Sequence, residues 1–268
     1  MKQVNPLSYN KEYYLNEYGE SNYSSEGGYF KSSKDTIYSE MANFVDLGPE
    51  DKIVDYGCGN GNLSFYLVSR YNCSCVGIDY SKDAIDICNN KLKAVPLYFD
   101  KIKFINSNNN QKYNFDNIKV VYLCDVVEHM YDQEIEVVLN QMKHWNKEDK
   151  IKIVIHIDNN IYLMLIKPVF DLVNILLGNS SIKETIRRNR YVKKRHINLT
   201  NPYWFKKKMK KFGFKEVYFR YPTQNMEERI RTQLGSLQKI PFLAELSFFV
   251  LKRLSFLNPS FYAIYVKM

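Results

Sequence analysis

The chain has 268 residues, of which 45% are hydrophobic and 25% are charged, and its formal net charge is +9. No apolar run reaches the roughly 20 residues of a membrane-spanning helix, and no secretory leader pattern opens the sequence. We therefore expect a cytoplasmic protein with one large domain, in which the five cysteines are reduced and buried.

Positive charge is concentrated in the C-terminal part of the chain. Residues 151–268 contain 22 basic and 7 acidic side chains, with basic runs at 187–195 and 206–211. Such segments attract phosphates, acidic lipids or anionic substrates. They also occur on solvated helix surfaces that have no partner. Four possibilities therefore remain open for the partner of these segments: an anionic small molecule, nucleic acid, a membrane surface, or no partner at all.

The first 34 residues differ from the rest of the chain. Residues 1–33 are rich in Tyr, Asn, Ser and Gly and show no clean periodicity. We expect an N-terminal arm over 1–34 that is either partly ordered or a lid over a ligand, because tyrosines suit the boundary of a binding site. The main domain is then 35–268, and it opens with an amphipathic helix predicted over 35–47.

A strand, a tight turn and a helix are predicted next. An apolar run ends at Asp55, and glycines follow at positions 57, 59 and 61. Glycines at this spacing let the backbone turn sharply and let a ligand approach the main chain. A second apolar run over 74–79 ends in Asp79, where dinucleotide-type sites keep a carboxylate for ribose hydroxyls. A glycine turn without a ligand is the alternative.

Five more strands complete the expected sheet. They are predicted at 102–106, 119–124, 151–157, 215–221 and 260–266, and helices are predicted after Ser81, over 133–145, over 161–177 with an interruption at Pro168, and after a Thr200 cap. The pattern predicts an α/β fold with a Rossmann-like, doubly wound sheet of seven mostly parallel strands. Insertions near 158–200 and 222–258 are expected to form a helical substrate cap. Residues 240–257 could instead lie on a membrane.

Four separated motifs resemble the class I S-adenosylmethionine (SAM)-dependent methyltransferases, especially their small-molecule members. They are Asp-x-Gly-x-Gly-x-Gly at 55–61, Gly-Ile-Asp at 77–79, Asp-Val-Val-Glu-His-Met at 125–130 and His-x-x-x-Thr at 196–200. The resemblance covers residues 35–221. Nicotinamide dehydrogenases usually show Gly-x-Gly-x-x-Gly instead, so the glycine spacing weighs against that class.

The resemblance implies SAM as methyl donor and S-adenosylhomocysteine (SAH) as product. It places Asp55 and the glycine turn at the amino-acid end of SAM, Asp79 at the ribose and Asp125 beside the sulfonium. The cofactor contacts that it implies are Asp55, Gly57, Cys58, Gly59, Gly61, Asp79, Tyr80, Asn108, Asp125 and Val126. Asn108 departs from the family pattern, which commonly has an acid there for the adenine amino group. An amide oxygen can still accept that hydrogen bond.

Three of the four histidines, His129, His156 and His196, fall at predicted strand ends or loops on the ligand-binding edge of the sheet. A neutral imidazole suits general-base catalysis, so these three are the catalytic candidates, with His129 or His196 first. A structural hydrogen bond to loop backbone is the alternative for each. Asp125, Glu128, His129 and His196 could also ligate one divalent metal. The same motif is widespread in metal-free family members, so we expect no metal.

The predicted function is transfer of a methyl group from SAM to a small-molecule acceptor. The histidines and the resemblance favour a hydroxyl oxygen of a sugar, a phenol or a secondary-metabolite intermediate. The basic C-terminal third supports RNA or lipid methylation as an alternative, with peripheral membrane or nucleic-acid contact. A catalytically silent SAM-binding regulatory protein is the non-enzymatic alternative. The acceptor and the oligomeric state have no signature in the sequence.

Overall fold

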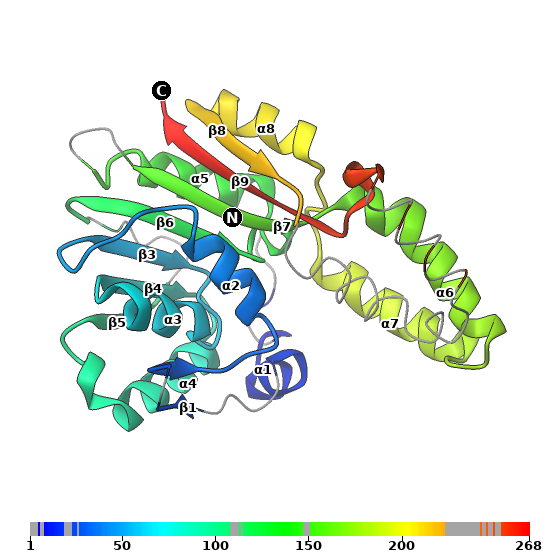
Figure 1. The fold of residues 1–268 in the computed structure, drawn as a ribbon, viewed down its shortest axis with the longest axis horizontal. Helices are drawn as coiled ribbons and strands as arrows, with labels where there is room; N and C mark the ends of the chain where they lie inside the picture. Colours follow the sequence, from blue (N-terminus) through cyan, green and yellow to red (C-terminus); the bar gives the residue numbers. More distant parts are fainter. Residues whose placement is uncertain are drawn as a thin grey trace.

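The computed structural model describes residues 5, 8–18, 23–25, 27–107, 113, 115–146, 151–222, 242, 245, 249 and 253–268. These residues form a seven-stranded sheet with helices on both faces, and a helical hairpin projects beyond one edge (Figure 1). The predicted α/β, Rossmann-like fold is confirmed.

The sheet that the described residues form has the order β5-β4-β3-β6-β7-β9-β8. In this sheet β9 runs antiparallel to the other six strands, which are parallel to one another. The strands are β3 (Lys52–Tyr56), β4 (Ser74–Asp79), β5 (Ile102–Asn106), β6 (Ile118–Cys124), β7 (Lys152–Asp158), β8 (Phe214–Arg220) and β9 (Ser260–Lys267). Each bound lies within one residue of its prediction, because the apolar runs of buried parallel strands are distinct in the sequence.

Two groups of helices cover the sheet. One face packs against α2 (Asp35–Ala42), α3 (Asn62–Tyr71) and α4 (Lys82–Ala94), and the other packs against α5 (Asp132–Met142) and α8 (Pro202–Lys211) (Figure 1). Met41 and Phe65 on the first face, and Met142 and Phe205 on the second, are almost completely buried. Burial of apolar surface, at roughly 25 cal/mol per Å², holds these layers together.

Helices α2 and α5 end several residues before their predicted ends at 47 and 145. After each helix the backbone tightens, because the N–H of Phe44 donates to Met41 and the N–H of Trp145 donates to Met142. Such bonds to the third preceding carbonyl close the last turn of a helix. The apolar residues that follow still pack into the core, which explains why their spacing extended the prediction.

The predicted cap of α8 is wrong by one residue. Asn201 is the N-cap, and its Oδ1 accepts a hydrogen bond from the N–H of Trp204 at 3.0 Å. Thr200 instead forms a parallel bridge with Asn159, and its carbonyl accepts from the N–H of Asn160 at 2.9 Å. Because Thr200 is held beside Asn159, the next side chain caps the helix.

The first predicted insertion forms the hairpin. It contains a π-helical turn, η4 (Tyr162–Ile166), followed by α6 (Lys167–Leu176) and α7 (Ile182–Arg195). Pro168 lies in the first turn of α6, where its missing N–H costs little, and the π-turn directly precedes it. Most of the second predicted insertion, 222–258, lies outside the described residues. The role of both insertions as a substrate cap stays a prediction.

The N-terminal arm is anchored on the domain. It contains α1 (Lys11–Tyr18) and the short antiparallel pair β1 (Tyr23–Ser24) and β2 (Tyr29–Phe30). The buried Phe30 ring contacts the Phe65 ring edge-on at 4.8 Å between centroids. Helix α1 and the helical hairpin of α6 and α7 both lie at the carboxyl edge of the central strands (Figure 1).

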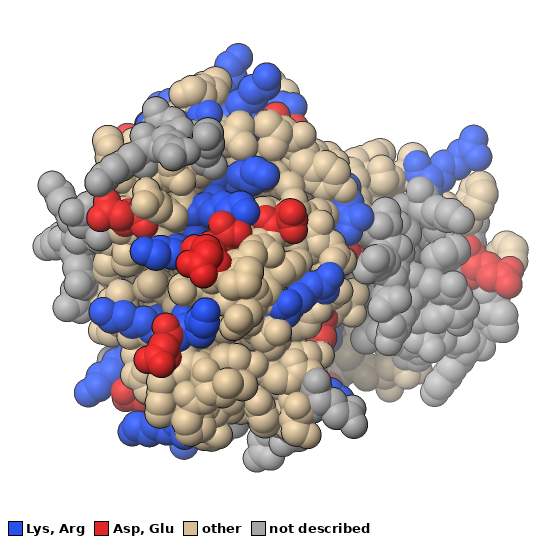
Figure 2. Space-filling model, turned by 60° about the vertical axis from the view of Figure 1, so that its left-hand side comes forward, with Lys and Arg blue, Asp and Glu red and all other residues tan. Residues whose placement is uncertain are grey.

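The two basic runs lie on helices. Residues 187–195 belong to α7 and residues 206–211 to α8. On the face shown in Figure 2, basic and acidic side chains are interspersed, so that face carries no field of one sign. Within the described part of the chain, no helix has the length and apolar content to cross a membrane. Nucleic-acid and membrane contact, and a cytoplasmic location, stay predictions.

Candidate active site

A cavity opens at the carboxyl ends of β3, β4 and β6, between the sheet and the arm. Its volume is about 690 Å³ when the open solvent at its mouth is included. We call it the first cavity, and it is lined by Tyr9, Tyr13, Tyr14, Tyr56, Gly57, Gly59, Ile78, Asp79, Tyr80, Ser107, Asp125, Val126, His129, Met130 and Glu134. Open α/β sheets bind ligands at this edge.

The glycine turn forms the floor of the first cavity. Gly57 has φ +75°, and a Cβ atom there would lie 2.2 Å from Cγ2 of Val126. No other residue fits this position without moving Val126. The N–H groups of Gly57 and Cys58 donate to the carbonyl of Ile78. The turn of β3 is thus fixed to the end of β4, which leaves bare main chain at the cavity floor.

Asp79 fixes the same turn from the end of β4. Its Oδ2 accepts from the N–H of Gly59 at 2.9 Å and its Oδ1 from the N–H of Ser81 at 2.8 Å. Ser81 begins α4 as predicted, with its Oγ accepting from the N–H of Ala84. Burial raises the pKa of Asp79 to about 6. The carboxylate is therefore pre-positioned in the cavity wall and mostly ionised at neutral pH.

Three predicted cofactor contacts lie outside the lining. Asp55 is buried below the turn, where its Oδ2 accepts from the Ser64 hydroxyl at 2.7 Å, and burial raises its pKa to about 7. Cys58 is buried, and a Cβ atom at Gly61 would contact Cys88 at 2.9 Å. The structure gives these residues a role in shaping the turn, and a direct cofactor contact stays a prediction. Asn108 lies outside the described residues, next to the lining residue Ser107.

Asp125 joins the sheet to the arm. It has φ +52°, its Oδ2 pairs with Nζ of Lys34 at 2.6 Å, and its Oδ1 bonds Nδ1 of His156. The charges of Lys34 and His156 overcome burial and hold the pKa of Asp125 well below its usual range. His156 lies on β7 beneath Asp125, is 2% exposed and lines neither cavity. His156 is thus placed to orient Asp125, and its catalytic role stays a prediction.

The rings of His129 and His196 contact each other. Their ring centroids are 4.8 Å apart, and Nδ1 of His129 lies 3.0 Å from the Tyr9 hydroxyl. Burial and the neighbouring His196 lower the pKa of His129 to about 3, so it is neutral at physiological pH. Nδ1 of His196 lies 3.5 Å from Oδ2 of Asp158. Only His196 of this pair therefore has a carboxylate partner that can orient it as a base.

The four residues considered as metal ligands do not converge. Among the described residues, the set whose ligand atoms come within 4.8 Å of one another is Cys124, Asp125 and His156. The ammonium group of Lys34 already contacts Asp125 there. Glu128, His129 and His196 are not part of that set.

A second cavity adjoins the first. Its volume is about 1190 Å³ with its open mouth included, and it lies between the hairpin, the arm and the end of β7. Its lining comprises Tyr13, His129, Asp158, Tyr162, Leu163, Lys167, Phe170, Asp171, Asn174, Arg188, Tyr191, Val192, Arg195, His196 and Pro259. Tyr13 and His129 line both cavities, so these side chains form a boundary that the two spaces share.

The sequence patterns do not mark Lys34 or Asp158 as site residues, and they indicate Tyr9 only as one of the tyrosines of the arm. Asp158 ends β7 just as Asp79 ends β4, so its position at a strand end was a usable signal. Lys34 and Tyr9 belong to the arm, and their partners Asp125 and His129 are about 90 and 120 residues away in sequence. No local sequence pattern predicts contacts between residues so far apart in the chain.

Replacing Glu128 with glutamine is expected to stabilise the protein at neutral and alkaline pH. Glu128 is 1% exposed, its Oε2 has no hydrogen-bond partner, and burial with the charges of Asp125 and Asp158 raises its pKa well above the usual range. The unfolded chain releases this proton more easily, so Glu128 lowers stability as pH rises above about 4.5. At pH 8 the variant should gain at least about 1 kcal/mol, or a few degrees in Tm.

Thermal unfolding from pH 4.5 to 8 measures this effect. Glu136→Gln on the exposed side of α5 is the matched control and should change little. The gain should shrink toward pH 4.5, where both proteins carry an uncharged group at position 128. An equal Tm for Glu128→Gln and wild type at pH 8 would contradict the buried, raised-pKa carboxyl.

Comparisons with known proteins agree with this geometry. A family model described as a methyltransferase domain matches residues 47–201. (S)-tetrahydroprotoberberine N-methyltransferase of Eschscholzia californica is 26% identical over 151 residues, which cover 50% of this chain and 39% of the relative. Phosphoethanolamine N-methyltransferase 3 of Arabidopsis thaliana is 28% identical over 94 residues, covering 35% and 19%. The matches thus span well under half the length of these relatives.

Solved structures share the fold at low identity. Geranyl diphosphate methyltransferase in complex with SAM superposes with a TM-score of 0.58 at 12% identity, covering 87% of this chain and 84% of that one. Geranyl diphosphate C-methyltransferase from Streptomyces coelicolor, in complex with Mg²⁺, geranyl diphosphate and SAH, gives 0.55 at 11%, covering 86% and 77%. Because the family model spans more than half of the chain, this protein belongs to the methyltransferase-domain family of class I SAM-dependent enzymes.

Proposed function

We propose that the protein transfers a methyl group from SAM in the first cavity to a hydroxyl oxygen of a small molecule in the second cavity. The observation that carries this proposal is the shared boundary of the two cavities at Tyr13 and His129. A donor and an acceptor can meet there without leaving the protein, and such positioning is a major source of rate enhancement.

The first cavity fits SAM. Its floor is bare main chain at Gly57, which a Cβ atom would fill, and its wall holds the buried carboxylate of Asp79. Asp79 would accept hydrogen bonds from the ribose hydroxyls, and Asp125 would face the sulfonium. When bound, SAM supplies a methyl group that its sulfonium already activates for displacement. The tyrosines of the arm, Tyr9, Tyr13 and Tyr14, would exclude water from this space.

His196 is our candidate base for a hydroxyl acceptor. Asp158 can hold the proton of its Nδ1, which leaves Nε2 able to accept the hydroxyl proton as the acceptor oxygen is methylated. His129 suits this task less well, because its lowered pKa makes it a weak proton acceptor and the Tyr9 hydroxyl occupies its Nδ1. At 3.5 Å, Nδ1 of His196 makes no hydrogen bond to Asp158 in this structure, so this role requires the two groups to move closer when the acceptor binds.

Nitrogen methylation is the second candidate. The two relatives named above, from Eschscholzia californica and Arabidopsis thaliana, are N-methyltransferases. The second cavity also contains the carboxylate of Asp158, which could bind an amine. Product analysis separates the candidates, since O-methyl and N-methyl products differ in their fragmentation and in their lability to acid.

His196→Gln is expected to lower kcat about 100-fold or more with a hydroxyl acceptor and to leave SAH affinity within about twofold, because a general base contributes roughly 10²–10⁴ in rate. The assay follows transfer from methyl-labelled SAM to a panel of phenols, sugars, hydroxy acids and amines. His144→Gln is the matched control, since His144 is exposed and lines neither cavity.

The outcomes of these binding and transfer assays distinguish the candidate functions. Unchanged turnover in His196→Gln would remove this base. SAH binding without transfer to any member of the panel, to RNA or to lipid vesicles would favour the silent SAM-binding class. Absence of SAM and SAH binding would overturn the proposed function itself.

A further inference from the structure

We infer that the second cavity contains an anion subsite, built around the guanidinium of Arg195, which binds a carboxylate or phosphate group of the methyl acceptor. The identity of the ligand as methyl acceptor rests on the proposed function. The subsite itself rests on the charges and contacts that line the cavity.

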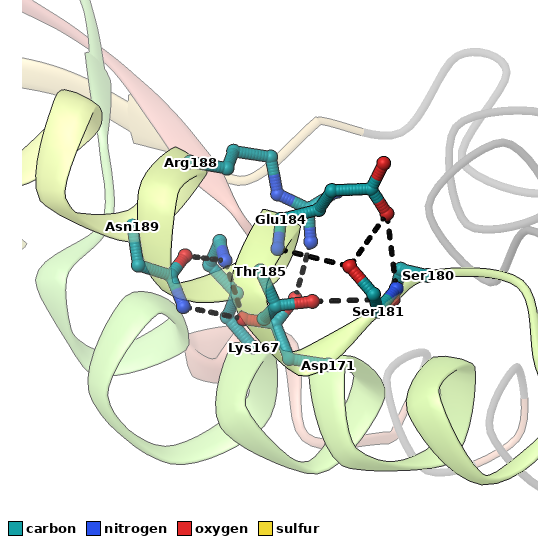
Figure 3. Close-up of polar contacts among 8 residues, drawn as sticks. All are labelled: Lys167, Asp171, Ser180, Ser181, Glu184, Thr185, Arg188 and Asn189. Atoms are coloured by element: carbon teal, nitrogen blue, oxygen red, sulfur yellow. Dashed lines mark hydrogen bonds and ion pairs between the residues drawn. The ribbon is translucent and has the colours of Figure 1, made fainter.

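Three cations line the second cavity, and two of them are already neutralised. Nζ of Lys167 and Nη2 of Arg188 each lie 2.7 Å from a carboxylate oxygen of Asp171. Nδ2 of Asn189 also donates to Asp171, at 2.9 Å, and Figure 3 shows these groups converging between α6 and α7. The charges of Lys167 and Arg188 are therefore used to hold the hairpin together.

Arg195 is the remaining cation, and the described part of the chain gives it no carboxylate partner within ion-pair distance. Its Nη2 donates to the carbonyl of Ser8 at 3.1 Å, while its Nε is buried without a hydrogen-bond partner. A buried donor left unpaired is costly, the more so on a charged group. The guanidinium therefore has both charge and hydrogen-bonding capacity that the protein leaves unused.

The guanidinium is held in a fixed orientation. It lies 3.6 Å from the ring centroid of Tyr191 and 5.2 Å from that of Tyr13. Stacking on aromatic rings restricts a guanidinium plane and keeps its N–H groups directed along that plane, the geometry that carboxylates and phosphates accept. A cation positioned in advance loses little entropy when it binds an anion.

The subsite lies close to the place where the cavities meet. Tyr13, beneath the guanidinium, lines both cavities, and the carbonyl of Arg195 lies 3.3 Å from Nδ1 of His129. Arg195 and the candidate base His196 are consecutive residues at the end of α7. An acceptor bound to both therefore carries an anionic group in addition to the hydroxyl that is methylated. This describes a hydroxy acid or a phosphate ester.

A titration of the full chain, saturated with SAH, with inorganic phosphate or acetate tests the subsite. Sodium chloride at matched ionic strength removes the general effect of salt. We expect a saturable rise in Tm with at least one of the two anions, and an affinity about tenfold or more lower in Arg195→Gln, as for loss of one charge-assisted hydrogen bond. Arg190→Gln, on the exposed side of the same helix, should behave as wild type.

The experiment also separates a purely structural role of Arg195, which joins α7 to the arm. That role predicts weaker SAH binding in Arg195→Gln with unchanged anion binding, and this result would overturn the proposal. An equal anion effect in wild type and Arg195→Gln, or no saturable effect in wild type, would overturn it as well. SAH affinity is measured separately, and the anion titration can be repeated without SAH. A failure of the methyltransferase proposal is therefore recognised independently of the anion result.

Discussion

Asp79→Ala is expected to weaken the binding of SAM and SAH about 100-fold or more. The carboxylate is buried in the wall of the first cavity and is held by the N–H groups of Gly59 and Ser81. Two charge-assisted hydrogen bonds to ribose hydroxyls are each worth about 1.5–3 kcal/mol, and a loss of 2.8 kcal/mol is about 100-fold. Isothermal titration with SAH measures the affinity, and thermal unfolding without ligand shows whether the variant is folded.

Two further variants make this test specific. Asp86→Ala removes an exposed carboxylate from α4, the helix that follows Asp79 in the chain, and should bind SAH as wild type does. Asp79→Asn keeps the shape of the side chain, removes its charge and replaces one acceptor oxygen by an NH2 donor. SAH affinity in either Asp79 variant within a few-fold of wild type would remove Asp79 from the cofactor site.

Cofactor affinity should also depend on pH through Asp79. Its pKa is raised to about 6 by burial, so the carboxylate is largely protonated at pH 5 and largely ionised at pH 7. A protonated carboxyl loses acceptor capacity, and wild-type affinity should fall about tenfold from pH 7 to pH 5. Asp79→Asn should show a much smaller change over the same interval.

Gly57→Ala is expected to abolish detectable SAH binding and to cost about 2–5 kcal/mol of stability. The left-handed backbone of residue 57 costs a non-glycine residue roughly 1–2 kcal/mol. The new Cβ atom would also lie 2.2 Å from Cγ2 and 2.8 Å from Cβ of Val126. Overpacking of this kind costs about 1–3 kcal/mol, and here it displaces two residues of the cavity floor. Thermal unfolding and SAH titration measure the two effects.

Gly178 offers a matched control. It has φ +73°, close to the value at Gly57, and a Cβ atom there would meet nothing within 4 Å. Gly178→Ala should therefore show the backbone cost alone and keep normal SAH affinity. Gly57→Ala combined with Val126→Ala should recover part of the lost stability. Equal losses in the two single glycine variants would contradict the close approach of Val126.

The sheet and the cofactor cavity could be predicted because local patterns specify them. Apolar runs that end in Asp55, Asp79 and Asp125 mark parallel strands whose carboxyl ends meet at one edge. The glycine at 57 signals a conformation that other residues adopt only with strain, and the structure shows φ +75° there. The motif does not distinguish residues that line the cavity from those below it, so Asp55 and Gly57 received the same role.

The acceptor side could not be predicted to the same depth. Its walls come from the arm, the hairpin and the end of β7, which are joined by contacts such as Arg195 with the carbonyl of Ser8 and His196 with Asp158. These pairs are distant in sequence and follow no period. The choice of Asn201 over Thr200 as a cap likewise depends on the bridge to Asn159, which only the folded chain shows.

The position of β9 has a consequence for the order of folding. In the sheet, β8 pairs with β9 and β7 pairs with both β6 and β9, so residues 260–267 join β8 to the rest of the domain. On β9, Tyr262 packs its ring 4.7 Å from that of His156, the partner of Asp125. During synthesis the central strands can pair early, but the edge of β7 stays open until β9 emerges. The packing of Tyr262 against His156, which in turn contacts Asp125, therefore forms last. A ribosome-bound chain lacking β9 would expose β7 as a pairing edge.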